Sequence, residues 1–196
     1  LPVGEMEAVQ AIATPPESEK APARTSTASG TGPVQAVRLD PELLEVFLEE
    51  FEAVAAMLGE KVPLWIRQQD SSDLLTEVRR GFHTLKGSGR MVGADEIGDF
   101  AWHIEALLNT VLEGSIESSD DVALVVRLTQ AMLPDMQRRL QQQPSELGAE
   151  AIEALAMQAD AIAAGNKPDW TELGHVLPAP VARLLHGGDA AAQETA

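Results

Sequence analysis

The chain has 196 residues, no cysteine and a formal net charge of −17. That length allows one domain with flanking segments or at most two small domains, and the missing cysteine excludes disulfides and thiolate metal sites. So acidic a chain is repelled by nucleic acid and by anionic membrane surfaces, so we expect it to bind neither. No apolar run approaches the roughly 20 residues of a membrane-spanning helix.

Residues 1–37 are predicted to be a disordered linker. They are rich in Ala, Pro, Ser, Thr and Gly and contain no aromatic residue, so they cannot bury enough apolar surface to offset the entropy of ordering them. Residues 5–13 could form a short helix. The chain begins with Leu1 and shows no basic region followed by an apolar stretch, so we expect a piece of a longer cytoplasmic protein without a signal peptide.

The first helix of the folded part is predicted to begin at Pro41. Asp40 supplies a cap and Glu42 places an acid in the first turn. The apolar residues that follow recur at spacings of three and four. They are Leu43, Phe47, Phe51, Val54 and Leu58. Gly59 and Pro63 are expected to end or interrupt this helix.

Two further helices are predicted between residues 70 and 113. The second follows 70–72 and weakens and stops across Gly87, Gly89 and Gly93. Its apolar stripe consists of Leu75, Val78, Phe82 and Leu85. The third spans about 94–113. Its stripe consists of Ile97, Phe100, Ala101, Ile104, Leu107, Leu108 and Val111.

A fourth helix is predicted to begin at 118–121, where Ser118 and Asp121 form a variant capping box. Its apolar face consists of Val122, Val125, Leu128, Met132, Met136 and Leu140. Pro134 is expected to kink or split it, because an interior proline costs about 3 kcal/mol. Four amphipathic helices with short connections and no strand-like alternation predict an all-α, antiparallel up-and-down four-helix bundle over residues 38–143.

Residues 144–196 are predicted to be an Ala-rich, partly helical linker or tail. Apolar residues at helical spacing could line a fifth helix, closed by Gly165 and Pro168. They are Leu147, Ala151, Ile152, Leu155, Ala159 and Ile162. This helix could pack on the bundle or sit loosely in a linker. Residues 169–196 could add one short helix, and the last ten residues are predicted to be disordered.

The local charge reverses around His83. Residues 78–94 hold four basic side chains and no acidic one, and the basic ones are Arg79, Arg80, Lys86 and Arg90. Phe82 and Leu85 continue the apolar stripe, so His83 lies off it with the basic side chains around it on the solvent side. An exposed imidazole can attack a phosphorus atom through one ring nitrogen.

The neighbours of His83 fit the same chemistry. Lys86, one turn on, can offset negative charge on phosphoryl oxygens, and Gly87 removes a side chain that would crowd an approaching partner. The arginines would favour a partner with an acidic active site, with a plain solvated face as the alternative. No glycine loop is followed by Lys-Ser or Lys-Thr, so a nucleotide must be held elsewhere.

Residues 83–87, His-Thr-Leu-Lys-Gly, resemble the core motif of histidine phosphotransfer (HPt) domains. Residues 88–93 and the helix with 105–108 are similar to the phosphoacceptor domain of CheA-type chemotaxis kinases. The likeness extends to an HPt domain of the multi-HPt hybrid kinases of type IV pilus chemotaxis-like (Chp) systems. It covers roughly residues 38–143.

The resemblance implies roles for individual residues. His83 matches the histidine that is phosphorylated at Nε2, and Lys86 and Gly87 match the lysine and glycine that follow it. Glu105 matches the glutamate that accepts a hydrogen bond from Nδ1–H, which would make Nε2 the better nucleophile. One departure is that chemotaxis kinases often have a second histidine three residues before the glutamate. Here Trp102 stands there and His103 follows it.

The resemblance also implies a phosphorelay intermediate of a two-component system. A kinase catalytic domain would phosphorylate His83 and a receiver-domain aspartate would take the phosphoryl group. ATP and Mg²⁺ are then expected on those partner domains, and no cofactor or metal is expected on this chain. The chain is expected to be monomeric as an isolated domain and to be part of a hybrid sensor histidine kinase. The alternative is a non-phosphorylated helical interaction module of such a kinase, which a buried His83 would favour.

Overall fold

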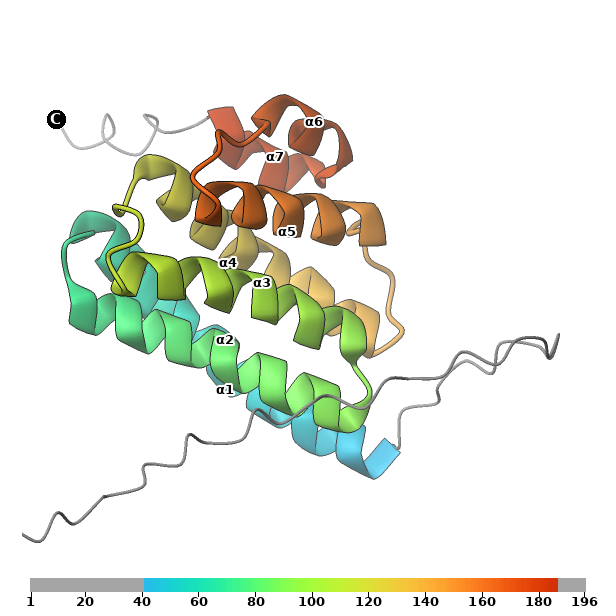
Figure 1. Ribbon diagram of the computed structural model, residues 1–196. Coiled ribbons are helices and arrows are strands. Elements are labelled where there is room, and N and C mark those ends of the chain that lie inside the picture. The colour runs from blue at the N-terminus through green and yellow to red at the C-terminus, as the bar shows by residue number, and fades with distance from the viewer. Residues whose placement is uncertain (1–40, 187–196) are drawn as a thin grey trace, which may run out of the picture. The chain divides into compact units, whose positions relative to one another are not determined.

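The computed structural model describes residues 41–186, and the regular structure within that range is entirely helical (Figure 1). Its helices are α1 (Pro41–Arg67), α2 (Ser72–Val92), α3 (Asp95–Leu112), α4 (Asp120–Leu140), α5 (Ala149–Ala163), α6 (Trp170–Val176) and α7 (Ala179–His186). None of these helices is both long and apolar enough to span a bilayer. The predictions for residues 1–37, for a helix at 5–13 and for the last ten residues lie outside the described range.

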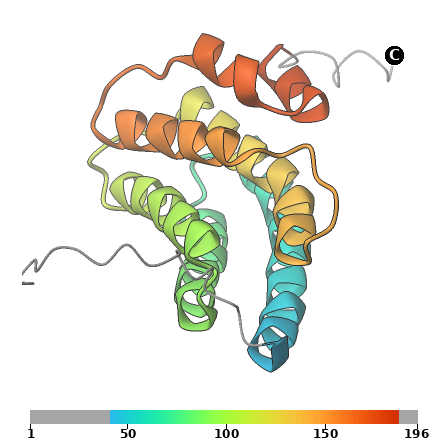
Figure 2. The same ribbon diagram turned by 90° about the vertical axis from the view of Figure 1, so that its right-hand side faces the viewer.

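The predicted all-α bundle is confirmed. α1 packs on α2 and α4, and α2 packs on α3, so that the apolar stripes of the four helices meet in one core (Figures 1 and 2). The stripe of α1 is buried from Phe47 onwards, but Leu43 is half exposed. Leu43 lies in the first turn of α1, where it borders a surface hollow instead of facing a neighbouring helix.

The prolines do not end or split their helices. α1 continues through Gly59 and Pro63, contrary to prediction, because Val62 and Trp65 on either side of Pro63 are fully buried. α4 likewise runs unbroken through Pro134 to Leu140. Fully burying large apolar side chains contributes about 1.5–3 kcal/mol each, which offsets the cost of about 3 kcal/mol for one interior proline.

Glycines set the distance between α2 and α3. A Cβ added to Gly89 would lie 3.2 Å from the Gly98 backbone nitrogen, and one added to Gly98 would lie 3.1 Å from the Arg90 nitrogen. The two backbones therefore approach more closely than side chains would allow. α2 runs through Gly87 and Gly89 and ends at Gly93, the last of the three glycines across which it was predicted to stop, where φ is 81°.

The predicted capping box at Ser118 was also wrong by one residue. The cap of α4 is Ser119, which has extended backbone and accepts a hydrogen bond from the Val122 N–H at 3.4 Å. The Ser118 hydroxyl instead donates to Gln69 Oε1 at 3.2 Å. That contact ties the α3–α4 connection to the end of α1, so Ser118 serves tertiary packing and not the helix terminus.

The segment after residue 143, predicted as a linker or tail, is packed structure as far as His186. α5 lies across α3 and α4, and its predicted apolar face is buried. α6 and α7, two short helices where one was expected, pack on α5 and on α4 respectively (Figure 2). Trp170 Nε1 donates to Asp121 Oδ1 at 3.0 Å, which fixes the start of α6 against α4. The sequence allowed α5 either to pack on the bundle or to sit loosely in a linker, and the structure shows that it packs on the bundle.

Candidate functional site

His83 projects from the middle of α2 into solvent. Its side chain is 58% exposed, and its Nδ1 lies 2.8 Å from Glu105 Oε1 on α3. A carboxylate can only accept a hydrogen bond, so Nδ1 is the donor and carries the proton. Among residues 41–186 no group hydrogen-bonds to Nε2, so the unprotonated nitrogen of the neutral ring is left for chemistry.

Glu105 is almost entirely buried, with 5% of its side chain exposed. Two cations from α2 approach it in addition to His83. Lys86 Nζ lies 2.6 Å from Oε2, and Arg79 Nη1 lies 3.3 Å from Oε1 and donates to it. A buried carboxylate is costly unless it is paired and hydrogen-bonded, and here two hydrogen bonds reach Oε1 while the ammonium of Lys86 forms an ion pair with Oε2.

The pKa of Glu105 reflects the balance of these effects. Burial raises the pKa of its carboxyl group, but hydrogen bonds from Lys86 and His83 and the positive charge of Lys86 lower it by more, so the pKa lies below its ordinary value. Glu105 is therefore ionised at neutral pH. An ionised acceptor holds the His83 ring in one tautomer and one orientation.

Gly87 and Arg80 face solvent beside the imidazole, as predicted. A Cβ on Gly87 would meet nothing within 4 Å, so the surface there is open to a partner. Within residues 41–186 Arg80 makes no ion pair. Arg90 pairs with the exposed Asp99 through two hydrogen bonds of 2.6 and 3.1 Å, so its charge is partly neutralised within the domain.

Arg79 is the site residue whose position sequence reasoning missed. It was assigned to partner contact, but it turns toward Glu105. Positions 79, 83 and 86 are spaced by four and three residues, which places them on one helix face. That spacing was visible in the sequence, but which face points to Glu105 depends on how α2 packs against α3.

A hollow between α1 and α2 borders His83, and we call it the α1–α2 hollow. Its lining includes His83, Gly87 and three exposed apolar side chains, Leu43, Val46 and Met91. Met91 is 84% exposed, which is unusual for so large an apolar residue. An apolar surface next to a reactive side chain is typical of a protein-docking surface.

His103, the second histidine of α3, lies outside this site. Its Nδ1 lies 2.8 Å from Asp160 Oδ1, which joins α3 to α5. Trp102, which stands where chemotaxis kinases often have a histidine, is 46% exposed and contacts the His103 ring edge to face. His103 therefore contacts the C-terminal layer and not the carboxylate beside His83.

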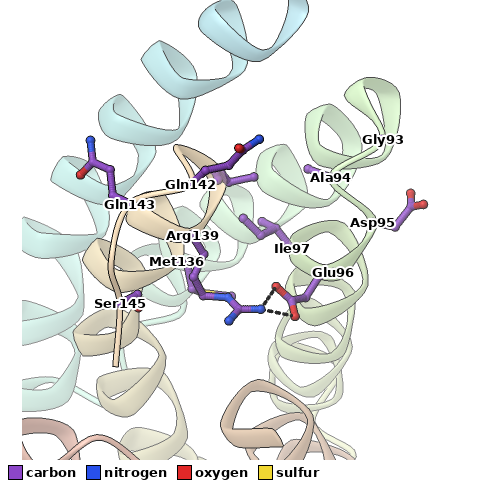
Figure 3. Close-up of a pocket in the computed structure, with 11 residues that line it drawn as sticks. Gly93, Ala94, Asp95, Glu96, Ile97, Met136, Arg139, Gln142, Gln143 and Ser145 are labelled. Carbon is purple, nitrogen blue, oxygen red and sulfur yellow. Dashed lines mark hydrogen bonds and ion pairs between the residues drawn. The ribbon is translucent and has the colours of Figure 1, made fainter. Parts of the chain in front are cut away.

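A second hollow lies where the α2–α3 turn meets the end of α4 (Figure 3). Arg139 spans it and donates to both carboxylate oxygens of Glu96, at 2.8 and 2.9 Å, and to the Leu147 carbonyl at 2.8 Å. The guanidinium that could attract an anion is therefore already paired. This hollow does not include His83 in its lining.

Residues 42–143 match the family model of the Hpt domain, which is more than half of the chain. The chain belongs to the Hpt domain family. It is 31% identical over 81 residues to the chemotaxis protein CheA of Borreliella burgdorferi, a stretch that is 41% of this chain but 9% of that protein. No solved structure matches the chain. The family and the relative identify this chain as a histidine phosphotransfer module of phosphorelay signalling.

Proposed function

We propose that His83 is the phosphoacceptor of this Hpt domain and reacts through Nε2. Glu105 holds the proton on Nδ1, which leaves an electron pair on Nε2 directed into solvent. Lys86, one turn further along α2 and paired with Glu105, has a flexible side chain that can turn toward a phosphoryl group on the ring and offset its charge. The observation that carries the proposal is an exposed imidazole backed by a buried, ionised carboxylate on the neighbouring helix.

The reaction needs two partner domains. A kinase catalytic domain supplies the γ-phosphoryl group of ATP with Mg²⁺. The electron pair of Nε2 forms a bond to phosphorus while the bond from phosphorus to the β-phosphate oxygen breaks. ADP leaves with the electron pair of the broken bond. A receiver-domain aspartate then attacks phosphorus, and the N–P electron pair returns to Nε2. The Nδ1 proton stays in its hydrogen bond to Glu105 throughout.

The α1–α2 hollow indicates the side from which a receiver domain approaches. Its apolar lining is continuous with His83 and with the open surface over Gly87. Arg80, which makes no ion pair within residues 41–186, lines a neighbouring hollow between the same two helices. Apolar contacts would supply affinity, while Arg80 would favour a partner with an acidic active site. The exposure of His83 favours this role over an interaction module that has lost phosphotransfer.

We propose that the parent protein is a cytoplasmic hybrid sensor kinase with several Hpt domains, of the type that controls type IV pili and twitching motility. The likeness to a chemotaxis kinase supports a chemotaxis-type kinase, and the pilus setting rests on the resemblance of the motif at residues 83–87 and its surroundings to such Hpt domains. As an isolated domain the chain is expected to be monomeric. Phosphotransfer profiling of the chain against kinases and receivers of chemotaxis and pilus systems would test the assignment.

The direct test is phosphorylation of the full chain by a kinase catalytic domain with labelled ATP. We expect an acid-labile label on the wild type and none on His83→Gln. His103→Gln is the matched control, because His103 makes the same kind of carboxylate contact away from the site. A label that persists on His83→Gln, or one lost only with His103→Gln, would contradict the proposal.

A further inference from the structure

Three donors from one helix converge on Glu105, although the family likeness accounts for only two of them. Oε1 accepts hydrogen bonds from His83 Nδ1 at 2.8 Å and from Arg79 Nη1 at 3.3 Å. Oε2 forms an ion pair with Lys86 Nζ at 2.6 Å. The contact of Arg79 is the longest of the three, and Arg79 shares Oε1 with His83 although Lys86 already pairs with Oε2. The third donor therefore calls for a reason.

Lys86 has two tasks that conflict. Its ammonium group is in contact with Glu105, yet the role proposed for it requires contact with a phosphoryl group on the outward-facing Nε2. Its long, flexible stem and its partial exposure, 23% of the side chain, allow it to move. When it moves, however, a carboxylate that is 5% exposed loses its nearest cation. Removing one partner of a buried charge is strongly unfavourable.

Arg79 is placed to compensate. Its guanidinium already contacts Glu105 Oε1 and cannot lose its charge. Arg79 lies one helical turn before His83, whereas Lys86 lies one turn after it. Neither other arginine of α2 can do this. Arg90 pairs with the exposed Asp99, and Arg80 lies beside the apolar lining of a different surface, between α1 and α2.

We propose that Arg79 is a positioning residue that keeps the charge of Glu105 compensated while Lys86 leaves the carboxylate to meet the incoming phosphoryl group. This inference rests on the proposed function of His83. During the step Nε2 bonds to phosphorus as ADP departs, and Lys86 exchanges one anionic partner for another without transferring a proton. Arg79 contacts neither the phosphoryl group nor the partner domain and acts only through Glu105 and Lys86.

A double-mutant cycle separates this role from simple stabilisation. The variants are Arg79→Gln, Lys86→Gln and the two combined, each phosphorylated at saturating kinase domain so that the rate and not the docking affinity is compared. Arg79→Gln should slow phosphorylation roughly fivefold, the scale of one partly exposed charge contact. In the Lys86→Gln background the same change should have almost no effect, because there is no lysine left to release.

Two further variants sharpen the result. Arg79→Lys keeps the charge and should recover most of the rate. Arg138→Gln removes an exposed arginine of α4 that pairs with Asp135, and should leave the rate unchanged. An equal slowing by Arg79→Gln with and without Lys86, or a loss of stability without any change in rate, overturns the inference. Absence of label on the wild type at His83 would instead reject the proposed function itself.

Discussion

Two histidines of this domain lie at the same distance from a carboxylate, but the exposure of the two pairs differs. Nδ1 of His83 and Nδ1 of His103 each lie 2.8 Å from a carboxylate oxygen, of Glu105 and Asp160 respectively. At the site the imidazole is 58% exposed and the carboxylate 5% exposed. At the junction of α3 and α5 the order is reversed, with an imidazole that is 26% and a carboxylate that is 52% exposed.

The difference shows that a histidine–carboxylate hydrogen bond does not by itself mark a phosphoacceptor. A buried carboxylate is shielded little by water and so orients the ring strongly, while the exposed ring remains accessible to another domain. At the α3–α5 junction water competes for Asp160, and the contact adds one exposed hydrogen bond to an interface that also buries apolar side chains of α5. The same two residue types therefore stand in opposite environments, and only the pair at His83 fits the phosphotransfer role proposed for it.

The largest effect is expected in the C-terminal layer, from Leu155→Ala. Leu155 on α5 is fully buried, so its truncation should lower the free energy of unfolding by about 2–5 kcal/mol. Urea unfolding measures this, and Met157→Ala is the control because Met157 on the same helix is 61% exposed. The folded fraction of Leu155→Ala should still be phosphorylated at the wild-type rate. A lower rate per folded molecule would show that the layer takes part in the chemistry.

The next largest effect is expected at the buried carboxylate. Glu105→Gln should slow phosphorylation of His83 roughly tenfold or more, because the neutral amide no longer enforces the Nδ1–H tautomer. Asp160→Asn, the matching change at the α3–α5 junction, should leave that rate unchanged. Both variants should keep the helical circular dichroism spectrum of the wild type. Equal rates for Glu105→Gln and the wild type would remove Glu105 from the mechanism.

A smaller effect is expected when bulk is added to each region. Gly87→Ala should leave stability unchanged or raise it by up to about 1 kcal/mol, since alanine favours helix, while slowing transfer to and from partner domains several-fold. Ala159→Leu should do the reverse, because Ala159 is fully buried in α5 and overpacking costs about 1–3 kcal/mol. If Gly87→Ala changes only stability, Gly87 has no part in docking.

The smallest effect is expected in the pH dependence of stability. The pKa of Glu105 is lowered in the folded state, so its contribution is fully present above its unfolded pKa of about 4.3 and is lost as the pH falls through the folded value. The stabilities of the wild type and Glu105→Gln should therefore converge as the pH falls from about 6 toward 3. Urea titrations across this range test the sign. Curves that diverge toward low pH would mean that Glu105 is not held ionised by its neighbours.

The sequence by itself determined the helices and the reactive residue. Apolar spacing of three and four residues along the chain identified the buried faces of α1 to α5, because a helix buries one face whatever its partners are. The motif from His83 to Gly87 and its basic surroundings indicated the chemistry, since those residues are close in sequence. A local rule failed where packing outweighed it, at Pro63, because α1 continues through that residue.

Only the tertiary structure decided which groups share the site and where the domain ends. The resemblance implied that Glu105 meets His83, and the structure shows this contact, but only the packing of α2 on α3 shows that Arg79 meets the same carboxylate. The C-terminal layer is part of the fold because α5 covers apolar surface of α3 and α4, which its thin, Ala-rich face did not reveal. Both outcomes depend on contacts between residues distant in sequence, and no local pattern encodes such contacts.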